Sequence, residues 1–249
     1  MMKKWLLIGF LGVFLSACAA DNTIPDRPPE ELYKEGMRLF DETDYDEAAR
    51  YFDEIERQHP YSEWAARSQI MAAYAFYRKN QYDDAILALD RFIQLHPGNK
   101  NTPYAYYLKG LCYYEQMSDI AREQQMAIDA KDTFQELIAR FPNSVYVADA
   151  TAKLGLIEDN LAGKEMAVGR YYLKTHEYLA AMNRFQNVIT YYASTNQADE
   201  AYYRLAACYV SLGMMKQARE LALAQENLYK GSKWAKRTLS LLQKYGKAK

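Results

Sequence analysis

Cys18 is the residue whose type and setting most clearly predict a chemical modification. It ends the segment Leu15-Ser16-Ala17-Cys18, which follows two lysines and the 11-residue apolar run Trp5–Leu15. A basic start, an apolar run and small residues form, in that order, a secretory signal, and 11 residues are too few to span a bilayer. The segment also matches the bacterial lipobox, in which the cysteine becomes the acylated first residue of the mature chain. We therefore predict a signal peptide over residues 1–17 and a lipid anchor at Cys18; an ordinary signal peptide that happens to contain a cysteine is the alternative.

The remaining residues that could do chemistry do not form a catalytic or metal-binding pattern. His59 and His96 each stand directly before a proline, and His176 lies just before Tyr178 with no metal-ligand partner at helical spacing. The sequence contains no HExxH, phosphate-binding glycine loop, G-x-S-x-G or paired-cysteine zinc motif. We expect no enzyme activity, no cofactor and no metal.

Charge argues against a nucleic-acid partner. Without Lys3 and Lys4, the mature chain has 29 basic against 32 acidic residues and no lysine-rich block. The segment Ala19–Pro29 contains three prolines and few apolar side chains, so residues 18–29 are predicted to form an extended, lipidated tether.

A repeated spacing of small residues, an aromatic or aliphatic residue and a proline organises the rest of the chain. In the first copy, Gly36, Ala48, Phe52 and Pro60 follow one another at intervals of 12, 4 and 8 residues. The other copies are Ala73, Ala85, Leu89, Pro97; Gly110, Ala130, Phe134, Pro142 with a longer first interval; Gly169, Ala181, Phe185; and Ala206, Ala218, Ala222. Three residues before the second small residue lies Tyr45, Tyr82, Tyr178 or Met215.

Each part of this pattern has a structural reason. Small residues allow two antiparallel helices to approach closely, the aromatic residue closes the turn between them, and proline ends the second helix. The pattern is that of the tetratricopeptide repeat. We therefore predict an all-α, right-handed superhelical solenoid of five helix pairs with a C-terminal capping helix over Ser232–Tyr245.

Two intervals are longer than the basic repeat. Ala85 and Ala130 are 45 residues apart, which predicts about two extra helical turns around Tyr114–Asp129. Ala130 and Ala181 are 51 residues apart, which predicts a long helix that joins three units to two. The expected domains are units one to three over residues 30–143, and the long helix, units four and five and the cap over residues 144–249.

Cys112 and Cys208 occupy equivalent positions in units three and five. Units stack about 10 Å apart, so equivalent atoms two units apart lie beyond the distance of about 7 Å at which a disulfide can close. We predict two buried free thiols.

One face of the first helices is predicted to line a peptide-binding groove. Positions three before, one after and four after each first small residue share a helix face. Arg67 and Arg78 flank this face and could pair with a terminal carboxylate. The residues on the face are Tyr33, Met37, Phe40, Ile70, Tyr74, Tyr77, Tyr107, Leu111 and Tyr114. The alternative is that other helices cover these side chains.

Several stretches resemble the BamD family, the tetratricopeptide lipoproteins of the outer-membrane β-barrel assembly machinery. The lipobox at Cys18, Arg27–Phe40, Phe134–Ala150 and, most specifically, Val168–Tyr192 carry the resemblance, which covers essentially the whole chain. Unit four departs from it because no proline closes the unit at Tyr191–Thr195.

The resemblance implies a non-enzymatic adaptor on the periplasmic face of the outer membrane. Its partners would be the barrel/POTRA subunit of the machinery, BamA-like, bound mainly through the C-terminal units, accessory lipoproteins, and unfolded outer-membrane protein precursors, bound through the N-terminal units. Such precursors commonly end in an aromatic residue. Two alternatives stay open: another periplasmic tetratricopeptide lipoprotein serving peptidoglycan hydrolases or an envelope-spanning complex, and a catalytic lipoprotein.

Overall fold

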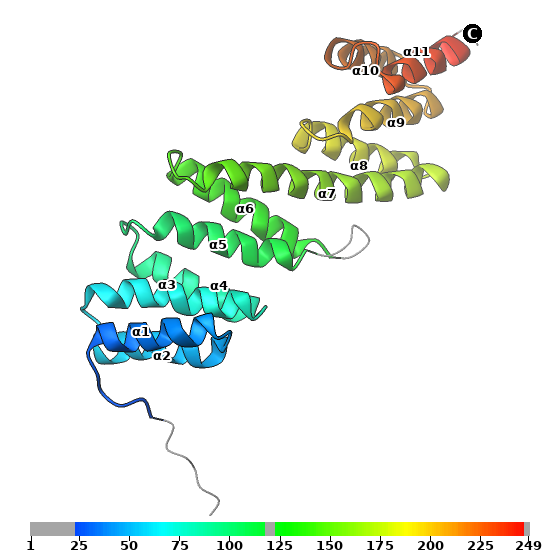
Figure 1. The fold of residues 1–249 in the computed structure, drawn as a ribbon. Coiled ribbons are helices and arrows are strands. Elements are labelled where there is room, and N and C mark those ends of the chain that lie inside the picture. Colours follow the sequence, from blue (N-terminus) through cyan, green and yellow to red (C-terminus); the bar gives the residue numbers. More distant parts are fainter. Residues whose placement is uncertain (1–22, 118–122, 247–249) are drawn as a thin grey trace, which may run out of the picture.

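The residues that the structure describes form eleven α-helices, which stack in chain order into an elongated array (Figure 1). The computed structural model describes residues 23–117 and 123–246, and these contain no β-strand. Cys18 lies outside the described residues. The helices are α1 (Pro29–Asp41), α2 (Tyr45–Gln58), α3 (Glu63–Arg78), α4 (Tyr82–Leu95), α5 (Thr102–Glu115), α6 (Gln125–Arg140), α7 (Val147–Lys174), α8 (Tyr178–Tyr191), α9 (Ala198–Ser211), α10 (Met215–Leu228) and α11 (Lys233–Gly246).

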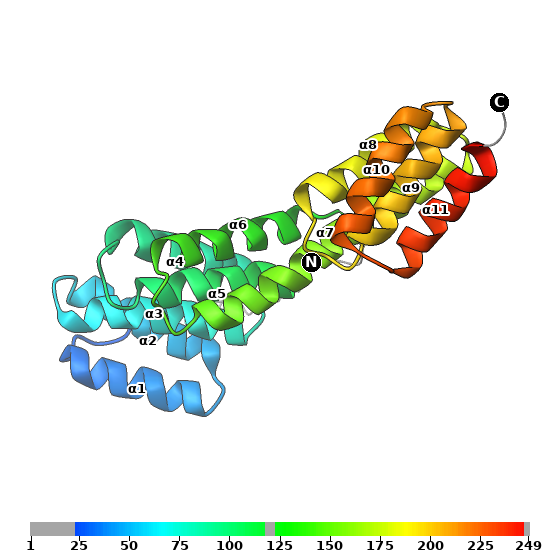
Figure 2. The ribbon, with the colours of Figure 1, turned by 90° about the horizontal axis from the view of Figure 1, so that it is seen from above.

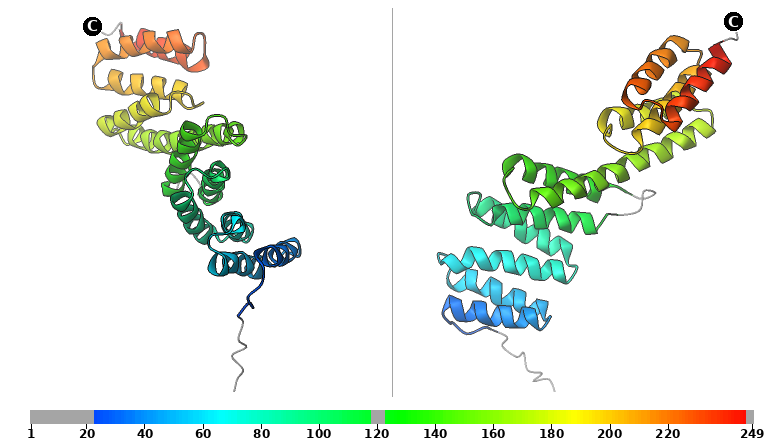
Figure 3. Two further views of the ribbon diagram at one scale, coloured as in Figure 1. Left: turned by 90° about the vertical axis from the view of Figure 1, so that its left-hand side faces the viewer. Right: turned by 45° about the horizontal axis from the view of Figure 1, so that its top comes forward.

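The helices form five pairs followed by one capping helix, which confirms the predicted tetratricopeptide solenoid. Each helix packs on its chain neighbours, and α11 packs on α9 and α10 (Figures 2 and 3). We refer to the pairs α1–α2, α3–α4, α5–α6, α7–α8 and α9–α10 as units one to five. The N-terminal unit and α11 lie at opposite ends of the array.

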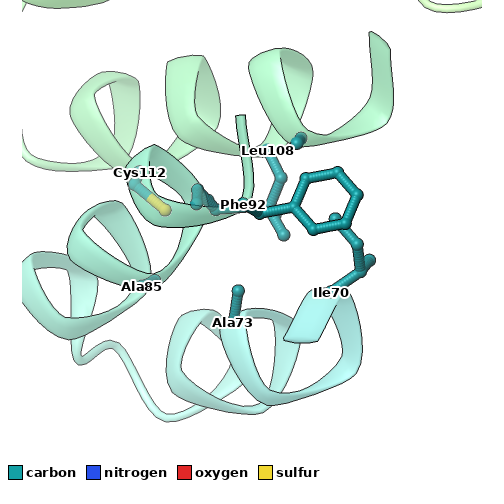
Figure 4. Close-up of a cluster of buried hydrophobic side chains, with 8 residues drawn as sticks. Ile70, Ala73, Ala85, Phe92, Leu108 and Cys112 are labelled. Atoms are coloured by element: carbon teal, nitrogen blue, oxygen red, sulfur yellow. The ribbon is translucent and has the colours of Figure 1, made fainter. Parts of the chain in front are cut away.

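The small residues of the repeat lie where helices cross, as the spacing predicts. Ala48, Ala85, Ala130, Ala181 and Ala218 are all fully buried. Figure 4 shows one of these crossings, where Ala73 and Ala85 belong to one buried cluster with Phe92 and Cys112. Small side chains at such positions let the backbones approach closely, so that a larger neighbour can fill the remaining space.

The turn inside a unit has the same backbone conformation in four of the five units. Thr43, Asn80, His176 and Gly213 each have φ between 61° and 73°. Each stands two residues before the aromatic residue or methionine that begins the second helix. His176 is therefore a turn residue in the left-handed region, and its ring contacts Tyr178 with 2.9 Å between Nδ1 and the hydroxyl oxygen.

His59 and His96 end the second helices of units one and two. Their φ angles are −132° and −130°, and Phe141 has the same conformation in unit three. Both histidines thus lie in equivalent turns that close a unit.

The insertion in unit three does not lengthen a helix by two turns, so that expectation was wrong. The first helix of the unit ends at Glu115 and the second begins at Gln125. The extra residues thus lie mainly between the two helices, because an interval between packing positions does not reveal where a helix ends.

The 28-residue helix α7 belongs to two hydrophobic clusters. Its residues Ala150, Ile157 and Leu161 pack with α5 and α6, whereas Ala162 and Met166 pack with α8 and α9. The long helix therefore joins units three and four and is also the first helix of unit four.

The segment before α1 is attached to α2. The Arg27 amide donates a hydrogen bond to Gln58 Oε1 at 3.1 Å, and His59 Nε2 lies 2.7 Å from the carbonyl oxygen of Arg27. Ile24 packs against the cluster of unit one. The part of the predicted tether from Ile24 onward thus lies on the repeat array, which shortens the chain between the array and Cys18.

Candidate peptide-binding site

Half-buried side chains of α1 and α3 form two groups of stacked or tilted aromatic rings, which together with Met37 we call the aromatic strip. Phe40 stacks on Tyr74 with 5.3 Å between ring centroids, and Tyr74 stacks on Tyr77 at 6.2 Å. At the other end, Tyr33 contacts Trp64 at 5.0 Å. The strip consists of Trp64, Tyr33, Met37, Phe40, Tyr74 and Tyr77.

The strip follows from the helix period. Met37 follows Tyr33 by four residues and Phe40 follows Met37 by three, so these side chains share one helix face. On α3, Tyr77 and Arg78 follow Tyr74 by three and four residues and share a face with it. Burial raises the pKa of Tyr33 and of Tyr77. Both side chains therefore stay neutral and keep a hydroxyl hydrogen to donate.

Two exposed arginines of α3 lie over the rings of the strip. The guanidinium of Arg67 is 5.1 Å from the centroid of Trp64 and 5.9 Å from that of Tyr33. That of Arg78 lies 5.7 Å from Phe40 and 5.9 Å from Tyr74. Within the described residues neither arginine forms an ion pair with a carboxylate. Both charges thus remain available to an anionic group of a ligand.

Four of the predicted groove residues do not lie on this open strip. Ile70 is only 6% exposed, because it packs with Ala73 and Ala85 inside the cluster of unit two. The other three belong to unit three and pack against the cluster that α7 completes: Tyr107, Leu111 and Tyr114.

Contacts from α7 account for this. The ring of Tyr107 stacks on Tyr146 at 5.0 Å, and its hydroxyl donates a hydrogen bond to Asp149 Oδ2 at 2.6 Å. Lys153 lies 5.0 Å from the ring centroid of Tyr114. In unit three, this face is therefore covered by another helix, as the alternative interpretation held, and is not an open groove.

Two residues of the site were missed by the spacing rule. Trp64 stands in the first turn of α3, three residues before Arg67, and Tyr45 contacts both Phe40 and Arg78. Trp64 could have been found, because it occupies the same helix face as Arg67 one turn earlier. Tyr45 was assigned only to the turn between the helices, although its ring also extends the strip.

A cavity of about 830 Å³ lies on the other side of α3, between α2 and α4. Phe76 lines it, and a residue two positions after Tyr74 points to the opposite helix face. Asp53, Glu56 and Arg91 also line it. Partial burial and the charge of Glu56 raise the pKa of Asp53 to about 6. This cavity thus combines charged and apolar side chains and is separate from the aromatic strip.

The part of the chain that the structure describes holds no group of three or more His, Cys, Asp or Glu side chains arranged to bind a metal ion.

None of the helices described for residues 23–117 and 123–246 is both long and apolar enough to cross a bilayer.

The five helix pairs of the described residues define a tetratricopeptide-repeat protein, and the aromatic strip on α1 and α3 gives it a candidate site for a peptide. The model of the YfiO family, described as outer membrane lipoproteins, matches residues 25–223. The chain belongs to this family.

Relatives with an assigned role agree with the family match. The chain is 43% identical to a Caulobacter vibrioides protein over 84% of this chain and 68% of that protein. It is 39% identical to a Rickettsia prowazekii protein over 94% of both chains. Both relatives are named outer membrane protein assembly factor BamD.

Solved structures show more distant similarity. The tetratricopeptide domain of P58(IPK) is 13% identical with a TM-score of 0.45, over 88% of this chain and 66% of that one. The TPR2AB domain of yeast Sti1 is 14% identical with a TM-score of 0.43, over 88% of this chain and 86% of that one.

Proposed function

We propose that this protein is a non-enzymatic lipoprotein of the outer-membrane β-barrel assembly machinery. An acylated Cys18 holds it on the periplasmic face of the outer membrane. Its N-terminal units recognise unfolded barrel precursors, and its C-terminal units bind the barrel/POTRA subunit. Membership of a family whose relatives are assembly factors supports the role. The single observation that carries precursor recognition is the aromatic strip, whose two arginines form no ion pair within the described residues.

The strip suits a peptide that ends in an aromatic residue and a free carboxylate. An aromatic side chain can stack on exposed ring faces of the strip, and such ring pairs contribute about 0.5–1.5 kcal/mol beyond the area they bury. The guanidinium of Arg78 can pair with the terminal carboxylate through two parallel hydrogen bonds. Arg67 and Arg78 are eleven residues apart on α3, or about 16 Å, which about five residues of an extended peptide would span.

Fluorescence anisotropy with a labelled peptide tests this site. The probe is a C-terminal barrel peptide that ends in phenylalanine, compared with the same peptide carrying an amidated C-terminus. Arg78→Ala and amidation should each weaken binding about tenfold, and together no further, because both remove the same ion pair.

Arg91→Ala is the matched control, since Arg91 lies on α4 beside the separate cavity between α2 and α4 and pairs with Glu56. Tyr74→Ala should also weaken binding. However, its ring is stacked between Phe40 and Tyr77, so its melting temperature must be measured as well. Unchanged peptide affinity in well-folded Arg78→Ala and Tyr74→Ala would move the site elsewhere.

Fractionation of cells tests the anchor. Cys18→Ala should leave an uncleaved precursor or release the protein from the membrane fraction. Mature protein that stays on the membrane through a high-salt wash, without lipid at residue 18, would contradict the anchor.

An adaptor for peptidoglycan hydrolases or an envelope-spanning complex is the other candidate for the same fold. Affinity purification from solubilised outer membranes separates the two roles. Recovery of a barrel protein with POTRA domains supports assembly, whereas recovery of hydrolases without a barrel protein supports the alternative.

A further inference from the structure

The segment just before α1 is bound to the end of α2 through both backbone polar groups of Arg27. The Arg27 amide donates a hydrogen bond to Gln58 Oε1 at 3.1 Å, and the Arg27 carbonyl oxygen accepts one from His59 Nε2 at 2.7 Å. Gln58 Nε2 also donates to the carbonyl oxygen of Pro25 at 3.4 Å. An extended chain usually receives such bonds from a neighbouring β-strand, and here two side chains take the place of a strand. We call residues 23–28 the docked segment.

Apolar and charged contacts extend the attachment along α2. Ile24 packs on the cluster of unit one, and Asp26 forms an ion pair with Arg57, with 3.7 Å between Oδ1 and Nη2. Thr23 and Ile24 line a cavity of about 530 Å³ together with four residues of α2: Arg50, Asp53, Glu54 and Arg57. Followed back from Arg27, the docked segment thus passes from the C-terminal end of α2 toward its middle.

Prolines restrict the docked segment and its junction with α1 to extended conformations. Pro25, Pro28 and Pro29 each disfavour a helical conformation in the residue before them, and Pro28 has φ −53° and ψ 140°. A chain restricted in this way loses less conformational entropy when it docks. The three prolines also carry no backbone N–H, which leaves fewer donors that need a partner.

The docked segment lies on the side of the array away from the aromatic strip. Two of the residues beneath it, Asp53 and Arg57, also line the cavity between α2 and α4, which α3 separates from the strip. We call this side, formed by α2 and α4, the outer side. Thr23, from which the chain leads back to Cys18, therefore lies on the outer side of unit one, at the end of the array opposite α11 (Figure 3).

Docking shortens the chain that is free between the array and the proposed anchor. Thr23 follows Cys18 by five residues, which reach at most about 17 Å, whereas α1 begins eleven residues after Cys18, a reach of about 37 Å. We propose that the docked segment is a positioning device, which keeps the outer side of unit one next to the bilayer and turns the aromatic strip toward the periplasm. The inference rests on the proposed lipid anchor at Cys18. An undocked segment would let the array turn any face of unit one to the membrane.

Hydrogen exchange in the full mature chain tests the docking itself. The Arg27 amide should exchange slowly because it donates to Gln58, and Gln58→Ala should speed its exchange by at least about tenfold. Gln94→Ala is the matched control, since Gln94 is an exposed glutamine near the end of α4 that the docked segment does not contact. It should leave the exchange of the Arg27 amide unchanged.

Energy transfer to the membrane tests which side of the array faces the bilayer. The acylated chain is placed on phosphatidylethanolamine–phosphatidylglycerol vesicles whose headgroups carry an acceptor dye. A donor dye is attached to Leu87→Cys or to Arg67→Cys, in a chain that also carries Cys112→Ala and Cys208→Ala. Leu87 is exposed on the outer side of α4, and Arg67 lies over the strip. Transfer should be more efficient from residue 87 than from residue 67.

Release of the docked segment should abolish this difference while the protein stays on the vesicles. The release variant combines Ile24→Ser with Gln58→Ala, which removes the apolar contact and the hydrogen bonds from the Gln58 side chain. Its matched control combines Ile24→Val with Gln94→Ala and should keep the difference. Melting temperatures show whether both variants are folded, and Gln58→Ala alone replaces a release variant that is not.

Four outcomes would overturn the inference. Rapid exchange of the wild-type Arg27 amide would show that the segment is not docked. Equal transfer from residues 67 and 87 in the wild type would show that the array has no preferred side, and a difference that survives in the release variant would assign the orientation to another part of the chain. Wild-type protein that leaves the vesicles would contradict the proposed anchor as well, which separates this failure from the other three.

Discussion

The ring of Phe134 occupies the space that a Cβ atom at Gly110 would need, because such an atom would lie 2.5 Å from Phe134 Cε1. Units one and four repeat the relationship, with 2.7 Å for Gly36 and Phe52 and 2.6 Å for Gly169 and Phe185. Unit two has Ala73 with Leu89 instead, and unit five has Ala206 with Ala222. A glycine thus stands wherever its partner is phenylalanine, so the two positions share one volume.

Gly110→Ala should therefore lower the free energy of unfolding. Alanine is usually favoured over glycine inside a helix by about 0.5–1 kcal/mol, but here overpacking against a buried ring costs about 1–3 kcal/mol. Adding Phe134→Leu should restore part of the loss, since it recreates the pairing of unit two. Chemical denaturation of the wild type, Gly110→Ala and the double variant measures the effect.

Gly155→Ala is the control for this prediction. Gly155 is exposed on α7, and a Cβ atom there would meet nothing within 4 Å. It should stabilise the protein by about 0.5–1 kcal/mol. Equal stabilisation by Gly110→Ala would show that the Phe134 ring can move aside without lowering the free energy of unfolding, and would contradict the prediction.

Ala85→Leu should lower the melting temperature clearly. Ala85 is fully buried between α3 and α5, in the cluster of Figure 4. The additional methylene groups would force the helices apart, at about 1–3 kcal/mol. Asp84→Ala, at the exposed neighbouring position, removes only a favourable charge in the first turn of α4, worth about 0.3–1 kcal/mol. Similar melting temperatures for the two variants would contradict the assigned helix face.

Asp53→Asn should stabilise the protein at neutral pH but not at pH 4. The pKa of Asp53 is raised to about 6, so between its ordinary value and 6 the folded protein binds more protons than the unfolded chain. Stability from this group therefore falls as pH rises through that window. Asparagine removes the charge, and the difference in melting temperature from wild type should grow from pH 4 to pH 7.

Glu54→Gln, on the same helix, should have the opposite effect on stability near neutral pH. Hydrogen bonds from Arg57, one of them 2.8 Å from Nε to Oε2, hold the pKa of Glu54 below its ordinary value. Glu54 therefore contributes stability above its ordinary pKa, and that contribution is lost as pH falls. Its replacement should destabilise the protein most near neutral pH. Parallel pH profiles for the two variants would contradict both assignments.

The periodic part of the fold could be predicted because each unit repeats the same packing problem. Residues such as Ala48 and Ala85 must be small because two helices cross at them. The spacing of these small residues therefore predicts the helix pairs directly. Contacts between units are different. Tyr107 and Tyr114 have the right spacing for an open face, but the path of the long α7 brings Asp149 and Lys153 onto them.

The contacts of segments without regular secondary structure could not be predicted from the sequence either. The prolines before α1 predict an extended chain, and residues 23–28 have no regular secondary structure, but this part lies on α2 through Gln58 and His59, more than thirty residues away. Side-chain hydrogen bonds to a backbone without secondary structure leave no periodic signal. The packing of α11, in contrast, follows from alternation of basic and apolar residues and was expected.

Cys112 and Cys208 should remain free thiols that react slowly in the folded protein. Both are fully buried and unpaired, in the clusters of units two to three and of units four to five. Burial raises the pKa of Cys112 to about 12 and that of Cys208 to about 11. The thiolate is the reactive form, so alkylation near pH 8 should be slow until the protein unfolds. The Cys18→Ala variant leaves only these two cysteines to react. Mass spectrometry should then find both labelled after denaturation without reductant, and neither after brief treatment of the native protein. A disulfide-linked peptide pair, or rapid native labelling of either residue, would contradict the packing of these helices.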